Sequence, residues 1–325
     1  MTRGQEGLSA LLQRAAGTRD PDLRYAIAVE LQSRTDRPTF EAACALARSS
    51  GLDERVLGLD ILGQLGYPAG RPFLEDTLPV ALACCDDDRP DVLSSAITAL
   101  GHLADRRGLP ATSDHVTHPS GQVRFAVAFA LPSVAGHHPP ADEAVNALIR
   151  LTRDPDAEVR DWATMGLSSP FEADTEEIRN ALADRLADEH RDTAGEALLG
   201  LAQRKDPRAL APLLAWLDSD HPGNLIVEAA AALGAAEALP ALKRLENTGW
   251  ANRDRRPSVL GQAIEACSRP ADGNRDHRCS RAPASNSSRS QQSGVGPGAV
   301  SHPPARASAS RDASRERVAQ TLERS

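Results

Sequence analysis

One amphipathic pattern recurs along this chain about every 34 residues, and it restricts the fold more than any other feature. In each copy, apolar residues follow one another at steps of four, three and one, which places them in a single stripe along a helix. The stripe is clearest at Val123, Val127, Ala130 and Leu131. Aligning the copies gives eight equivalent positions, at intervals of 31 to 38 residues: Arg24, Arg55, Leu93, Arg124, Arg160, Asp192, Ile226 and Leu260.

A second set of apolar helices lies between these copies. The clearest cover residues 74–85, 144–151, 178–186, 210–217 and 239–245. Each pair of helices predicts one helical hairpin. A single hairpin cannot bury its own apolar stripe, so neighbouring hairpins must stack against each other.

Helix starts and ends carry their own signals. Asp-Pro pairs, as at Asp154-Pro155, supply a side-chain cap and a fixed φ for the first turn. Gly63, Gly101 and Gly234 follow the last leucine of their stripes. At that place a glycine either allows close packing between helices or ends the helix.

In these features the chain resembles a known family. The stretch Asp154-Pro155-Asp156-Ala157-Glu158-Val159-Arg160 and the stretch from Asp206 to Leu214 resemble HEAT repeats, and more narrowly the short bacterial type called phycobilisome-lyase-like. The resemblance covers about residues 6–268. It implies an all-α fold, an α-solenoid of about eight stacked hairpins, in which the second helix of each hairpin lines the concave face. We therefore expect a solenoid over residues 1–268 and a separate tail over 269–325.

Charge divides the chain at the same place. The net charge is −8, but residues 269–325 hold 10 Arg against 5 acidic residues, so the preceding 268 residues carry a net charge of −13. Nucleic-acid binding depends on basic patches, so we expect the acidic body not to bind nucleic acid. The tail is rich in Ser, Arg, Pro, Ala and Gly, a composition typical of disorder. Three interpretations of the tail are open: it is inert, it is an arm that folds back on the body or contacts nucleic acid, or it is out-of-frame coding.

The cysteines and apolar runs bear on localisation. Five Cys occur, none in a C-x-x-C spacing, which favours a reducing cytoplasm with thiols used as small apolar residues. No long apolar run follows Met1, so we expect no signal peptide. No apolar stretch reaches 18 residues, so we expect no membrane-spanning helix.

Four arginines occupy one repeat position: Arg24, Arg55, Arg124 and Arg160. They form either a groove for acidic groups or a structural ladder that pairs with turn acids such as Asp22, Asp156 or Asp53. Planar bidentate pairing suits arginine to the second role, and HEAT repeats in general use their arginines this way. We expect the ladder, with Asp22 and Asp156 among its partners.

Aromatic residues supply the candidate binding surface. Phe125 and Phe129 lie off the apolar stripe, and Tyr25 is equivalent to Phe125. The resemblance implies that these rings face the concave groove, next to Asp161 and Met165, where aromatic side chains are typical interface anchors. The alternative is packing against a neighbouring repeat. Trp162 sits beside the stripe, and we expect it to be mostly core.

Catalytic and metal signals are weak. His102, His115, His118, His137 and His138 cluster in sequence without a recognisable ligand spacing, so we expect no metal and no cofactor. The chain has no His-Glu dipeptide, on which the HEAT-repeat enzyme deoxyhypusine hydroxylase is built, and no cationic groove such as HEAT-like DNA glycosylases use. We therefore expect a non-catalytic cytoplasmic scaffold that binds a partner protein or peptide on its concave face. The alternative is a phycobilin-lyase-like or tetrapyrrole-protein assembly factor.

Overall fold

The protein is described by a computed structural model that covers residues 7–18, 20–136, 140–168, 173–219, 222–248, 250 and 257–269. The described residues form helices and turns and contain no strand. The predicted tail, apart from Arg269, lies outside these residues, as do His137 and His138. No helix in the described ranges is long and apolar enough to cross a membrane.

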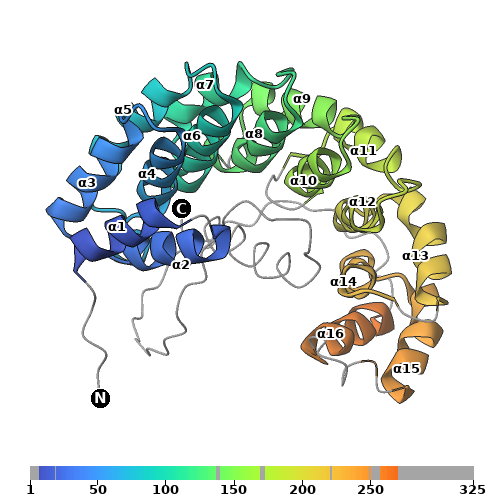
Figure 1. The fold of residues 1–325 in the computed structure, drawn as a ribbon. Coiled ribbons are helices and arrows are strands. Elements are labelled where there is room, and N and C mark those ends of the chain that lie inside the picture. The colour runs from blue at the N-terminus through green and yellow to red at the C-terminus, as the bar shows by residue number, and fades with distance from the viewer. Residues whose placement is uncertain are drawn as a thin grey trace, which may run out of the picture.

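Within the described ranges, sixteen α-helices pair into eight hairpins in chain order, and the hairpins stack side by side into an arc (Figure 1). The all-α solenoid predicted from the repeat is confirmed. After the first hairpin, the odd-numbered helices form the outer rim of the arc and the even-numbered helices form its inner row (Figure 1).

The inner row consists of the second helix of each hairpin, and each aligned repeat position lies on one of these helices. Its members are α2 (Pro21–Gln32), α4 (Leu52–Gln64), α6 (Pro90–Leu103), α8 (Gly121–Val134), α10 (Ala157–Ser168), α12 (Arg191–Gln203), α14 (Asn224–Leu233) and α16 (Pro257–Ser268).

The first helices of the hairpins are shorter on average. They are α1 (Leu8–Gly17), α3 (Arg37–Ala47), α5 (Leu74–Cys84), α7 (Leu109–Ser113), α9 (Asp142–Leu151), α11 (Glu176–Ala183), α13 (Leu210–Leu217) and α15 (Leu239–Asn247). Short 3₁₀ turns at Tyr67–Ala69, Arg106–Gly108, Pro207–Ala209 and Ala236–Ala238 lead toward four of them.

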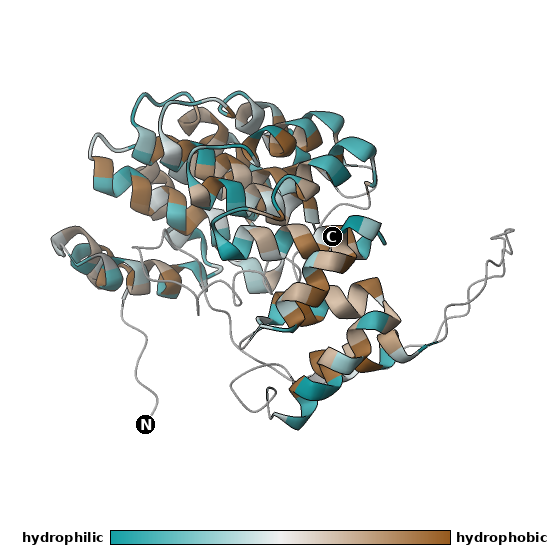
Figure 2. Cartoon of the chain, turned by 90° about the vertical axis from the view of Figure 1, so that its right-hand side faces the viewer, coloured by the Kyte–Doolittle hydropathy of each residue, from teal (hydrophilic) through white to brown (hydrophobic). Residues whose placement is uncertain are grey.

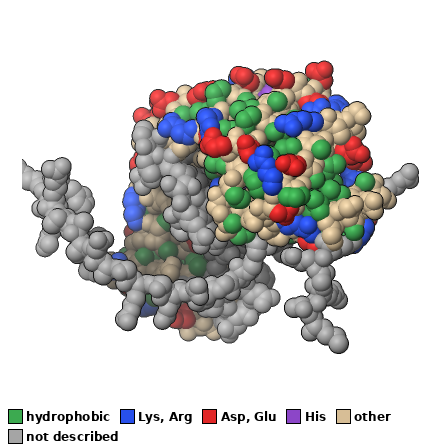
Figure 3. Space-filling view, turned by 90° about the vertical axis from the view of Figure 1, so that its left-hand side faces the viewer, with side chains coloured by type: hydrophobic (Ala, Val, Ile, Leu, Met, Phe, Trp, Pro, Cys, Tyr) green, Lys and Arg blue, Asp and Glu red, His purple; other side chains and the backbone are tan. Residues whose placement is uncertain are grey.

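Stacking buries one continuous apolar core along the whole arc. Hydrophobic colour gathers along the helix middles and hydrophilic colour at the helix ends and loops (Figure 2). The stripe residues Val123, Val127, Ala130 and Leu131 are all fully buried, because α8 is covered by its outer partner α7 and by the inner helices α6 and α10 on either side. On the face shown in Figure 3, acidic and basic side chains lie intermingled with apolar ones.

The repeat glycines serve both of the purposes that the sequence left open. A Cβ on Gly63 would lie 3.0 Å from Ala99 Cα, and one on Gly101 would lie 2.8 Å from Ala130 Cα, so these glycines let inner helices approach closely. Gly234 instead has φ +68° and ends α14 in the left-handed conformation that glycine adopts without strain.

Candidate functional site

The inner row leaves one face of each helix toward the hollow of the arc. Outer helices cover the opposite face and neighbouring inner helices cover the two flanks. Tyr25 and Phe125 share one repeat position on the inner helices, and Val29 and Met165 share another one turn later; all four are half-buried.

Four rings from three consecutive inner helices meet at the middle of this row. We call His102, Phe125, Phe129 and Trp162 the aromatic cluster. The His102 and Phe129 ring centroids lie 5.1 Å apart, and the Trp162 ring lies 5.3 Å from Phe129 and 5.8 Å from Phe125, all edge to face. This geometry is the favourable one for aromatic pairs, so the cluster joins α6, α8 and α10 through their side chains.

The members of the cluster differ in exposure from what the sequence indicated. Phe129 is only 8% exposed and packs over Gly101, where a Cβ would lie 3.1 Å from the ring. Trp162 is half-buried: it packs against the buried core and lies edge to face with both phenylalanine rings. His102, Phe125 and Trp162 are thus half-buried, whereas Phe129 is almost fully buried.

Asp161 is not available as a groove residue. It is 8% exposed, and its Oδ1 accepts a hydrogen bond from Thr193 Oγ1 of α12 at 3.3 Å. His190 Nδ1 lies 3.8 Å from the same oxygen. The carboxylate thus ties α10 to the start of α12. Met165, on the same helix, keeps part of its side chain exposed.

The four repeat arginines each pair with an aspartate of the following unit. Arg124 holds Asp154 with two hydrogen bonds of 2.7 and 2.9 Å, and Arg160 holds Asp188 with two of 2.9 and 3.0 Å. Two further pairs are looser or single: Arg24 with Asp53 at 3.3 Å and Arg55 with Asp87 at 2.6 Å.

These arginines also bond to the turn that precedes their own helix. Arg124 donates to the carbonyls of His118 and Pro119, and Arg160 donates to those of Asp154 and Pro155. Four of the five N–H groups of Arg160 are directed at these partners or at Asp188, which leaves little capacity for a ligand. The arrangement favours a structural ladder over an anion groove.

Asp22 and Asp156 are not the carboxylates that receive the ladder hydrogen bonds. The Asp156 carboxylate accepts the backbone N–H of Glu158, and the Asp22 N–H donates to Asp20, so both residues serve helix starts. The partners that the sequence analysis missed are Asp87, Asp154 and Asp188. Their place in the sequence could have identified them, because each lies in the turn just before the next inner helix.

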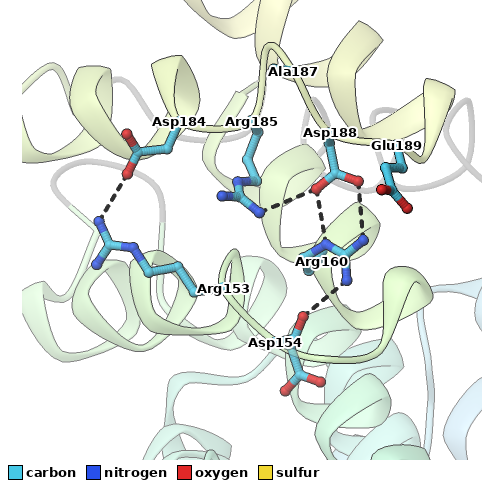
Figure 4. Close-up of a pocket in the computed structure, with 8 residues that line it drawn as sticks. All are labelled: Arg153, Asp154, Arg160, Asp184, Arg185, Ala187, Asp188 and Glu189. Atoms are coloured by element: carbon cyan, nitrogen blue, oxygen red, sulfur yellow. Dashed lines mark hydrogen bonds and ion pairs between the residues drawn. The ribbon is translucent and has the colours of Figure 1, made fainter.

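An open depression of about 330 Å³ lies beside the Arg160–Asp188 pair of the ladder, between the turns of two units (Figure 4). Most of its charged lining is already paired: Arg160 and Arg185 both reach Asp188, and Arg153 reaches Asp184 at 3.1 Å. Three arginines and four acidic residues line it together, which makes it a nearly balanced part of the ladder rather than an ion site.

Basic side chains cap the opposite ends of the inner helices. Arg204 is 6% exposed and donates to the carbonyls of Leu167 and Ser168 at the end of α10. Lys205 reaches the last carbonyls of α14, and Arg71 reaches the carbonyl of His102 in α6. Cations at helix C-termini satisfy the free carbonyls and oppose the helix dipole. Burial lowers the pKa of both Arg71 and Arg204.

Reactive groups are scarce in the described part of the chain. No three His, Cys, Asp or Glu side chains there converge in a metal-binding arrangement. Cys44, Cys84, Cys85 and Cys267 are buried free thiols, and burial raises the pKa of Cys85 to about 12. Such thiols are poor nucleophiles, since the thiolate is the reactive form.

Comparison with known proteins agrees with the architecture. A model of HEAT repeats matches residues 78–168 and 145–234. The protein YibA of Escherichia coli is 35% identical over 124 residues, which is 38% of this chain and 42% of YibA, so the match spans less than half of that relative.

A solved structure gives the same result for the fold. The crystal structure of YibA from E. coli superposes on 82% of this chain and 93% of its own, with a TM-score of 0.62 and 24% identity. The complex of CpcE and CpcF of phycocyanin lyase from Nostoc sp. PCC7120 matches 81% of this chain and 96% of its own, with a TM-score of 0.45 and 18% identity.

Proposed function

We propose that this chain, whose residues 78–168 and 145–234 match a model of HEAT repeats, is a non-catalytic scaffold that binds a segment of a partner protein or peptide on its concave face. The observation that carries the proposal is the aromatic cluster, with Phe125 and Trp162 half-buried at the middle of the inner row. Large, partly exposed rings at the centre of a concave surface are typical anchors of protein interfaces.

The scaffold hypothesis is consistent with the state of the other side chains of the inner row. The ladder arginines and Asp161 hold neighbouring units together, and the described thiols are buried. What the inner row offers to a ligand is shape, apolar rings and carboxylates. Buried reduced thiols also support a cytoplasmic location, where glutathione keeps cysteines reduced.

Binding can be tested with two matched tryptophans. Trp162 lies on inner helix α10, and Trp216 lies on outer helix α13; both are half-buried. We expect the double variant Phe125→Ser, Trp162→Ser to lose its partners in affinity purification from the native host, while Trp216→Ser keeps them. Far-ultraviolet circular dichroism must show unchanged helix content in both variants. Retention of the same partners by the double variant would rule out the concave face as the binding surface.

The tetrapyrrole alternative has a separate readout. Purified protein mixed with bilins or haem should leave their visible spectra unchanged if the chain is a scaffold. A shifted spectrum that the double variant abolishes would favour a tetrapyrrole-protein assembly factor instead.

A further inference from the structure

The two rows of the arc differ in charge. The eight inner helices carry twelve acidic side chains against five arginines, whereas the outer helices carry eight acidic side chains against six basic ones. Four of the five inner arginines are the ladder arginines. Three of those are paired with aspartates in turns, outside the inner helices. The inner helices are therefore the more acidic of the two rows.

Carboxylates also occur along this row. Glu158 lies one helical turn before Trp162 on α10, and Glu228 lies on α14, two inner helices further along the arc. A guanidinium group stacks on aromatic faces and pairs with carboxylates in the same plane. The combination of half-buried aromatic rings with carboxylates on the same row suits a segment rich in arginine.

Residues 270–325 of the same chain have that chemistry. They hold nine arginines against five acidic residues. They begin one residue after Arg269, directly beyond α16, so they leave the solenoid at the end of the inner row. Four inner-helix spacings of about 8–10 Å separate α16 from α8, roughly 40 Å in all. A chain of this length can span up to about 180 Å when extended, so the cluster is well within reach.

We propose that residues 270–325 bind to the inner row of their own solenoid, with arginine side chains over the aromatic cluster and against its carboxylates. A tethered segment acts at a high effective concentration, so weak contacts suffice to hold it there. It would then compete with any partner for the concave face. That competition rests on the proposed function, whereas the intramolecular contact itself does not.

The chain contains a built-in probe for this contact. Cys279 lies within the segment, and the four described cysteines are at most 5% exposed. A maleimide-benzophenone should therefore label Cys279 in the native full-length protein. After irradiation, peptide mapping by mass spectrometry should find the cross-links on inner helices, with Met165 of α10 a preferred acceptor. Raising the salt from about 0.05 M to about 1 M should lower this yield threefold or more, because the Debye length falls to about 3 Å.

Variants in the segment test the role of charge. The triple substitution Arg275→Gln, Arg278→Gln, Arg281→Gln should lower the inner-helix cross-links threefold or more, whereas lysine at the same three positions should keep most of them. Cross-links that fall mainly on outer helices, that are absent, or that survive the glutamine substitutions would overturn the proposal. A covalent dimer joined through the inner row would also overturn it, in favour of a second copy of the chain. None of these outcomes depends on finding a partner protein.

Discussion

At the scale of single residues, the chain separates structural arginines from exposed ones by burial. Arg160 and Asp188 are 16% and 3% exposed, whereas Arg153 and Asp184, in the same depression, are 59% and 52% exposed. Removing one partner of a buried, bidentate pair leaves a charge without compensation, while an exposed pair is replaced by water.

This contrast predicts the effect of two alanine substitutions. We expect Arg160→Ala to lower the free energy of unfolding by about 2–3 kcal/mol, since Asp188 would keep only Arg185 and the His190 N–H as donors. Arg153→Ala should change it by less than ~0.5 kcal/mol. Urea unfolding followed by circular dichroism measures both. Equal effects would show that the ladder arginine is not structural.

A second motif at this scale is an Asp-x-Arg clasp that recurs at Asp87–Arg89, Asp105–Arg107 and Asp206–Arg208. In each, the aspartate accepts the backbone N–H, Nε and Nη2 of an arginine two residues later. The side-chain hydrogen bonds from Arg208 hold the pKa of Asp206 well below its ordinary value, and they outweigh burial, which acts in the opposite direction.

The lowered pKa fixes the sign of a pH dependence. A carboxylate whose pKa is lowered by folding stabilises the fold fully above its unfolded-state pKa of about 3.9. This contribution is lost as the pH falls toward the pKa of the folded state. Wild type should therefore be more stable than Asp206→Asn at pH 7, and the difference should shrink steadily below about pH 4. Urea midpoints at pH 7, 5, 4 and 3 measure this. A difference that stays constant over that range would mean that the clasp does not depend on ionisation.

At the scale of helices, two glycines of the inner row differ in how closely a neighbouring helix packs against them. A Cβ on Gly101 would lie 2.8 Å from the backbone of Ala130 in α8, whereas a Cβ on Gly261 in α16 would meet nothing within 4 Å. Glycine inside a helix costs about 0.5–1 kcal/mol relative to alanine, so only close packing justifies it.

The same substitution should therefore act in opposite directions at the two positions. Gly101→Ala should destabilise the protein by about 1–3 kcal/mol, since α6 and α8 must move apart. Gly261→Ala should stabilise it by up to ~1 kcal/mol. Thermal unfolding at matched concentration distinguishes them. A stabilising Gly101→Ala would mean that the two helices are not in close contact.

The inner helices were predictable from the sequence because a single local pattern, the spacing of apolar residues, defines them. The apolar stripe alone placed Arg24, Arg124 and Ile226 on separate inner helices, because the stripe depends only on spacing. Contacts between units were not predictable in the same way. The units differ in length, so spacing could not reveal that Arg124 reaches Asp154, or that Trp162 contacts both Phe125 and Phe129. Those contacts depend on the turns and on side-chain rotamers.

At the scale of the whole molecule, the arc behaves as a chain of nearest neighbours. Each hairpin contacts mainly the units before and after it, and the ladder, the close glycines and the aromatic cluster all join adjacent units. The two end hairpins have a neighbour on one side only. Stability in such an array is a sum of unit and interface contributions, so a local change should have a local effect.

Hydrogen exchange of Arg160→Ala tests this property directly. The substitution weakens the interface between α10 and α12, so backbone amides of those two helices should exchange faster than in wild type. The acceleration should fade with distance and be absent in α2 and α4, because no ladder pair in those units is touched. Arg153→Ala, on the same depression, serves as the control and should leave all helices unchanged. Uniform acceleration from α2 to α16 would instead indicate that the solenoid opens as one cooperative body, and the concave face would then form or dissolve as a whole.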